Sequence, residues 1–190
     1  MRLVKIMVIS YFILIWGDIQ AECLVFKPVF KLMNYRAILL KDVAANKYKN
    51  QQSVFDAAQE LKILQQVYTY AEELSIENYS LMQYAQIQMD LSKQIEQYWL
   101  NLWQSNPLLA PKDGQYKNLK YIRQQIQILD KQIYPSLARS IKLNSCSNAD
   151  IQGEFVANFR AIKGIPIAPD FSRLMVNAIL SIKLKVKKNQ

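Results

Sequence analysis

The sequence predicts an all-α fold, a helical bundle of about six helices. Two observations predict it: apolar residues recur about every 3.6 positions along most of the chain, and the apolar–polar alternation typical of β-strands is scarce. A third observation bounds the size, because 190 residues with 51% hydrophobic and 21% charged content suffice for one domain with a full core. We therefore expect residues 22–190 to form a single all-helical domain.

The first expected helix, residues 28–49, carries charge on its apolar face. Helical periodicity places five apolar residues on that face: Val29, Leu32, Met33, Leu40 and Val43. Arg36 and Lys47 fall in the middle of the same face, although the opposite face already holds several lysines that water can solvate. An ionised group that faces a core is unfavourable unless it is paired, so these two cations need a partner.

Two long helices are expected next. One covers residues 53–74, with Ser53 as its N-cap and Asp56 three positions later. Ser75 is the expected cap of the other helix, which continues to Trp103. Residues 106–114 then break the pattern, because prolines and a glycine interrupt the periodicity.

The C-terminal part of the chain is expected to add three helices. Apolar residues from Leu119 to Ile133 mark a helix that should bend or end at Pro135, because a proline ring does not fit into a regular helix. Two shorter helices are expected at residues 149–162 and 170–185, separated by a proline-containing segment.

Residues 1–21 are expected to be a signal peptide rather than part of the fold. Arg2 and Lys5 precede an apolar run at residues 6–16 that is too short to span a bilayer, and Ala21 offers a cleavage point. This interpretation predicts a periplasmic or secreted protein with no stable membrane anchor after cleavage. An uncleaved anchor is the alternative.

The composition excludes several kinds of catalytic site. The sequence contains no histidine, which excludes Ser-His-Asp triads, Cys-His pairs and the common zinc sites. Its glycines are isolated, so neither a P-loop nor a dinucleotide-binding motif can form. The two cysteines, Cys23 and Cys146, would lie in an oxidising compartment, but their spacing alone does not decide whether they pair.

The net charge of +9 does not by itself indicate a nucleic-acid partner. Basic residues are spread along the chain, and they cluster only at residues 183–188. We interpret this cluster as a solvated chain end, with a membrane or nucleic-acid patch as the alternative, and expect no nucleic-acid partner.

Polar residues on other apolar faces add to the two cations of the first helix. Ser92 and Glu96 lie four residues apart on one stripe of the third helix, and Arg123 lies beside the apolar positions of the fourth. Internal pairing, of Glu96 with Lys47 or Arg123, is one explanation. A small dianionic ligand is the other, because the cations of this set outnumber its carboxylates and leave positive charge to be neutralised.

Four segments within residues 30–133 together resemble the all-helical chorismate mutases, in particular their secreted branch. These segments are FKLMNYRAILLKDVAANKYKN, VFDAAQELKIL, QMDLSKQIEQYWLNLW and YIRQQIQILDKQI. An Arg-x10-Lys spacing followed by an Asp nine residues later carries much of the likeness, and the secreted branch also has a helical C-terminal extension. The resemblance implies a chorismate mutase type II-like bundle.

The same resemblance implies an enzyme that converts chorismate to prephenate by a Claisen rearrangement, without metal or cofactor, as a homodimer. Within the family pattern, Arg36 and Arg123 would bind the two carboxylates of the substrate. Lys47 would donate a hydrogen bond to the ether oxygen whose bond breaks, and Glu96 would lie on the other side of that oxygen.

Three further positions complete the site that the resemblance implies. Asp56 would lie near the ring hydroxyl, and Ser92 would line the pocket. Gln59 stands where the family pattern has an arginine, so one expected cation is missing, and Lys62, one turn further on, could partly replace it. This departure keeps open an alternative function, a non-catalytic helical protein that binds a small anionic ligand or partner.

Overall fold

The computed structural model describes residues 24–160, 163–167 and 170–186, and the regular structure in them is helical. The 3-10 helices are η1 (Leu24–Phe26) and η2 (Pro107–Leu109). The α-helices are α1 (Lys27–Ile38), α2 (Leu40–Lys49), α3 (Ala57–Glu73), α4 (Asn78–Ser105), α5 (Leu119–Lys142), α6 (Asn148–Asn158) and α7 (Phe171–Leu180). The prediction of an all-α bundle is therefore confirmed.

The first expected helix is divided into α1 and α2 at Leu39, which raises the number of described α-helices from the expected six to seven. Leu39 itself keeps a helical backbone, with φ −67° and ψ −20°, so α2 continues almost directly from α1. Arg36 on α1 and Lys47 on α2 are both 5% exposed, as expected for residues on the apolar face.

Two predicted helix starts are wrong. Helix α3 is capped by Asp56, whose side chain accepts a hydrogen bond from the Gln59 amide at 3.1 Å, and Ser53 instead accepts one from the Phe55 amide within the preceding segment. Ser75 does not cap α4, because its φ of +54° places it in the left-handed region two residues before the N-cap, Glu77. Helix α5 passes through Pro135, one of the two outcomes expected there, and ends at Lys142.

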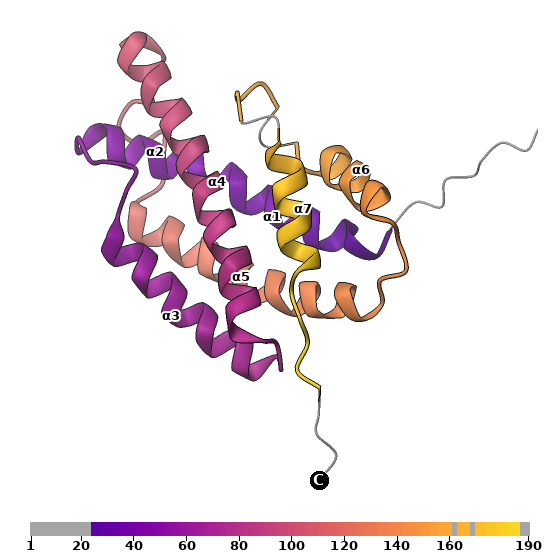
Figure 1. Ribbon diagram of the computed structural model, residues 1–190. Coiled ribbons are helices and arrows are strands. Elements are labelled where there is room, and N and C mark those ends of the chain that lie inside the picture. Colours follow the sequence, from indigo (N-terminus) through magenta and orange to yellow (C-terminus); the bar gives the residue numbers. More distant parts are fainter. Residues whose placement is uncertain (1–23, 161–162, 168–169, 187–190) are drawn as a thin grey trace, which may run out of the picture.

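Helix α4 is the central element of the bundle (Figure 1). Helices α2 and α3 pack against it, and α7 packs against both α4 and α6. Helix α1 packs against α5 and α6, and Figure 1 shows it passing behind α7. Aromatic contacts join α1 to α6, where the rings of Phe30 and Phe155 meet edge to face with their centroids 5.3 Å apart. This packing leaves α3 attached mainly to α4.

The segment after α7 is held against the turn between α3 and α4. The Lys185 amide donates to the Ser75 carbonyl at 2.7 Å, and the Glu77 amide donates to the Lys183 carbonyl at 2.8 Å. These two bonds flank an isolated bridge between Ile76 and Leu184. The C-terminal extension thereby fixes the turn from which α4 starts.

Two predictions about the N-terminus fall on residues that are not described. The expected signal peptide, residues 1–21, lies outside the described residues, as does Cys23. Cys146 is disulfide-bonded.

Among the described helices, none combines the length and the apolar character needed to cross a membrane.

Candidate active site

Side chains from α1 to α5 surround a cavity with about 680 Å³ of empty volume, including its open mouth. The cavity is lined by all seven residues predicted from the sequence, Arg36, Lys47, Asp56, Gln59, Ser92, Glu96 and Arg123. Its apolar lining consists of Leu40, Val43, Val54, Ile63, Met89 and Ile126. The structure therefore brings together the polar residues of segments far apart in the sequence.

Arg36 is held by partners from two other helices. Its Nε donates to Asp130 Oδ1 on α5 at 3.0 Å, and its Nη1 donates to Ser92 Oγ on α4 at 2.8 Å. The Ser92 hydroxyl in turn donates to the Gln88 carbonyl at 2.9 Å. The guanidinium plane is thus fixed, while Nη2 has no partner among the described residues and can donate to a ligand.

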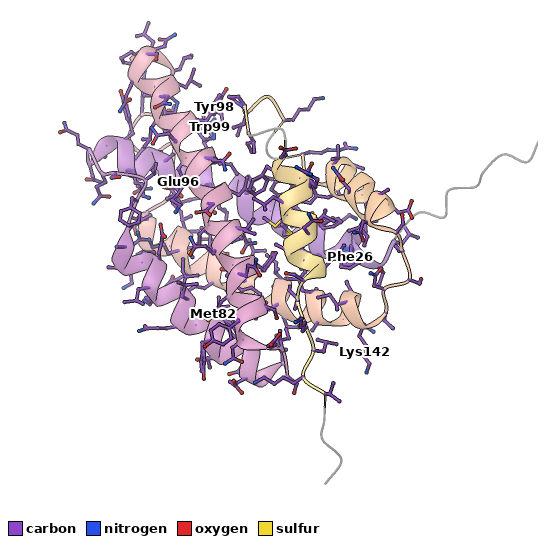
Figure 2. The ribbon with its side chains drawn as sticks, viewed as in Figure 1. Phe26, Met82, Glu96, Tyr98, Trp99 and Lys142 are labelled. Atoms are coloured by element: carbon purple, nitrogen blue, oxygen red, sulfur yellow. The ribbon has the colours of Figure 1, made fainter. Side chains whose placement is uncertain are left out.

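Lys47 forms a buried ion pair with Glu96. Its Nζ donates to Glu96 Oε2 at 2.7 Å and to the Val54 carbonyl at 2.8 Å, which leaves one N–H without a partner in the described part of the chain. Glu96 is 6% exposed, and Figure 2 shows it on the part of α4 that lies beside α2. A donor on an ammonium group and a buried carboxyl group therefore lie side by side in the cavity wall.

Arg123 and Asp56 form a more exposed ion pair. Arg123 Nη2 donates to Asp56 Oδ2 at 2.7 Å, and about a third of each side chain is exposed to solvent. Because Asp56 also caps α3, one carboxylate fixes both the start of that helix and the position of the Arg123 guanidinium. This pair lies where solvent reaches the cavity.

Gln59 lies in the cavity wall, but its side-chain amide forms no hydrogen bond within the described residues. Lys62, proposed from the sequence as a substitute for the missing arginine, is exposed and does not line the cavity. Lys93 lines it instead, and its Nζ lies 2.9 Å from Asp90 Oδ1 and 3.3 Å from Glu60 Oε1. The helical position of Lys62 turns it to solvent, so it cannot fill the gap left at Gln59.

The expected surplus of positive charge is wrong for the described cavity. Four cationic and four carboxylate side chains line it, and each cation has a carboxylate partner. Asp130 was missed by the sequence analysis, although a signal was present. It lies four residues after Ile126 and three before Ile133, and therefore on the apolar face of α5, like Arg36 on α1.

Burial separates the carboxyl groups of the cavity into two kinds. Burial raises the pKa of Glu96 despite the opposing charge of Lys47, and burial likewise raises the pKa of Asp130 beside Arg36. The pKa of Asp56 is lowered, first by the hydrogen bond from the Gln59 amide and then by Arg123. Glu96 and Asp130 are therefore the groups most easily protonated when a further anion enters.

These groups can bind a small molecule with two anionic groups and place a proton donor against it. Arg36 and Arg123 both have N–H groups without protein partners among the described residues, and Lys47 has one N–H left. No group of three or more metal-ligating side chains occurs in the part of the chain that the structure describes.

No family model matches the chain. The secreted chorismate mutase from Yersinia pestis superposes with a TM-score of 0.68 at 24% identity, over 83% of this chain and 97% of that one. The chain has the chorismate mutase fold. Two further chorismate mutases share this fold. The enzyme from Burkholderia phymatum superposes with a TM-score of 0.67 at 19% identity, over 88% of this chain and 99% of that one. The enzyme from Burkholderia thailandensis superposes with a TM-score of 0.65 at 18% identity, over 83% of this chain and 98% of that one. The predicted chorismate mutase type II-like bundle is thereby confirmed as the fold.

Proposed function

We propose that the protein is a chorismate mutase, an isomerase that converts chorismate to prephenate. The observation that carries the proposal is the Lys47–Glu96 pair, 2.7 Å apart in the wall of a cavity that Arg36 and Arg123 also line. Chorismate has two carboxylates and an ether bond that breaks during the rearrangement. The cavity offers a cation for each carboxylate and a donor for the ether oxygen.

The arginines would hold the reactive shape of the substrate. The rearrangement requires the enolpyruvyl side chain to fold over the ring, a conformation in which the two reacting carbon atoms approach each other. Arg36 is fixed by Asp130 and Ser92, and Arg123 by Asp56, so two carboxylates bound to these guanidinium groups would have little freedom to separate. The substrate would then lose this conformational entropy on binding, and no longer on the way to the transition state.

Lys47 and Glu96 would act on the bond that breaks. Negative charge develops on the ether oxygen in the transition state, so a donor aimed at this atom stabilises the transition state more than the substrate. The remaining N–H of Lys47 is one such donor. Protonated Glu96 would be the second, and its raised pKa favours that form. No nucleophile or cofactor takes part in this scheme.

A non-catalytic protein that binds a small anionic ligand is the second candidate. Two observations favour it: Gln59 contributes no charge where the resemblance implies an arginine, and the cations of the cavity are already paired with carboxylates. A binding protein would hold the dianion without stabilising charge on the ether oxygen. Both candidates would therefore bind the same ligand, and only the enzyme would convert it.

The test is the disappearance of chorismate in the presence of purified residues 22–190. We expect prephenate to form with saturation kinetics and at the same rate after treatment with a metal chelator. A variant carrying Lys47→Met serves as the negative control, because it removes the donor while keeping a side chain of similar length. Binding of chorismate without conversion would establish the second candidate instead.

We also propose that the enzyme works in the periplasm or outside the cell, as a homodimer. The disulfide-bonded state of Cys146 and the signal-like residues 1–21 support the location, because disulfides persist in oxidising compartments. The dimer rests on the resemblance alone. Cell fractionation with N-terminal sequencing tests the first point, and light scattering of the purified protein tests the second.

A further inference from the structure

Lys93 is a cation in the cavity wall that the proposed mechanism does not use. It lies on α4 between Ser92 and Glu96, which also line the cavity. Its Nζ contacts Asp90 and Glu60, at 2.9 and 3.3 Å, and lies 5.9 Å from the centroid of the Phe55 ring. The ammonium group thus rests between the start of α3 and one turn of α4.

Lys93 can leave its partners at a lower cost than the two buried cations, Arg36 and Lys47. The carboxylates that bind Arg36 and Lys47 have side chains no more than 10% exposed, so moving either cation away would leave a buried charge without a partner. The side chain of Lys93 is 27% exposed, and those of its partners Asp90 and Glu60 are 47% and 19% exposed. Water can therefore solvate Asp90 when Lys93 turns away.

The net charge of the cavity does not match that of the proposed substrate. With four cations paired to four carboxylates, the described cavity has no net formal charge, whereas the proposed substrate is a dianion. Gln59, one position before Glu60 on α3, is neutral and has no side-chain partner among the described residues. Lys93 has a flexible stem with four methylene groups and can follow an anion over several ångströms.

We propose that Lys93 binds a carboxylate of the substrate at the mouth of the cavity, in place of the cation that position 59 lacks. On substrate entry its Nζ leaves Asp90 and Glu60 for the ligand, and water reaches both carboxylates, Asp90 more than Glu60. This role deepens the proposed function and rests on it. It makes Lys93 a substrate-binding residue that determines affinity rather than a group that acts on the breaking bond.

The experiment compares Lys93→Met, Glu60→Gln and Lys62→Met with the unmodified chain. Methionine keeps the length of the stem and its contact with Phe55 but removes the charge. Steady-state kinetics with chorismate should show KM raised about tenfold in Lys93→Met, the loss expected for one charge-assisted hydrogen bond, with kcat nearly unchanged. Lys62→Met removes the same charge from an exposed site outside the cavity and should leave KM unchanged.

Glu60→Gln separates substrate binding from a structural role. It breaks the same ion pair but keeps the ammonium group, so release of Lys93 becomes easier and KM should fall. If Lys93 only braced α3 against α4, both variants would raise KM to a similar extent, and this result would overturn the proposal. Equal KM values for Lys93→Met and Lys62→Met would overturn it as well.

Calorimetric binding of chorismate distinguishes failure of this proposal from failure of the proposed function. If the unmodified chain binds chorismate without converting it, the enzyme assignment fails, and a Kd about tenfold weaker in Lys93→Met still supports the role of Lys93. If that Kd does not change, the Lys93 proposal fails by itself. Absence of both binding and turnover overturns both proposals.

Discussion

The buried and exposed ion pairs of the cavity carry the same charges in different surroundings. Arg36–Asp130 and Lys47–Glu96 have side chains no more than 10% exposed, whereas about a third of each side chain in Arg123–Asp56 is exposed. A charge that loses its partner in the first group cannot be solvated by water, but in the second group it can. The buried pairs should therefore control stability and protonation, and the loss of one partner in the exposed pair should cost less.

The largest expected effect is the loss of activity in Lys47→Met. Loss of one donor to an atom that gains negative charge lowers rates about a hundredfold to a thousandfold in other enzymes, and we expect kcat/KM for chorismate to fall by this amount. Lys49→Met is the matched control, because Lys49 lies on the same helix but is exposed and outside the cavity. Nearly normal kcat/KM in Lys47→Met would remove Lys47 from the proposed mechanism.

The second largest expected effect is a difference in stability between variants that break a buried ion pair and variants that break an exposed one. Arg36→Met leaves Asp130 buried without its cation, and we expect the free energy of unfolding in urea at neutral pH to fall by about 3 kcal/mol. Arg123→Met removes the partner of a carboxylate that water can solvate, and the loss should be below about 1 kcal/mol. Adding Asp130→Asn to Arg36→Met should restore much of the stability. Equal losses in the two single variants would contradict the distinction between buried and exposed pairs.

The apolar-face rule found some of the site from the sequence and could have found more. It selected Arg36, Lys47 and Glu96, because a charge within a helical apolar stripe is unusual. The same rule applies to Asp130 on α5, which was overlooked and is the partner of Arg36. The pairing itself could not be predicted, because these two residues are 94 positions apart and meet only when α1 packs on α5.

Helix boundaries were harder to predict than the helices themselves. Ser75 has the residue type of an N-cap, yet its backbone adopts φ +54° where its carbonyl accepts a hydrogen bond from Lys185. That partner lies in the C-terminal extension, so no local pattern around Ser75 contains the information. As a residue that could start this helix, Asp56 was considered only for its place three positions after Ser53, yet its own capping hydrogen bond decides where α3 begins. Local propensity gave the helices, and long-range packing set their ends.

The two groups of carboxylates predict opposite responses to pH. Burial raises the pKa of Glu96 and Asp130, so their contribution to stability is complete below the ordinary carboxyl range and is lost as pH rises through the raised values. The pKa of Asp56 is lowered, so its contribution is present above the ordinary range and is lost as pH falls through the lowered value. We therefore expect the free energy of unfolding in urea to decline less in Glu96→Gln than in the unmodified chain as pH rises above the carboxyl range.

The activity should depend on pH through the same group. If protonated Glu96 donates to the ether oxygen, kcat/KM should fall as pH rises through its raised pKa, because the carboxylate cannot donate. Glutamine at this position is a permanent donor of similar shape, and Glu96→Gln should flatten the profile. An active Glu96→Gln variant with the original pH profile would show that another group is responsible.

The smallest expected effect concerns position 59, where the comparison between buried and exposed pairs can be sharpened. Gln59→Arg adds a cation beside the cavity mouth, at a half-buried position near Glu60, so its effect on stability should be slight. If a cation at the mouth assists binding, kcat/KM for chorismate should rise about threefold to tenfold, less than a fully buried charged hydrogen bond would give. Because Lys93 is proposed to supply that cation already, the gain should be larger when Lys93→Met is also present. An equal rise in kcat/KM with and without Lys93→Met would mean that residue 59 and Lys93 contact different parts of the ligand. No rise in either case would mean that the cavity mouth binds the ligand through the Gln59 amide and needs no cation at this position.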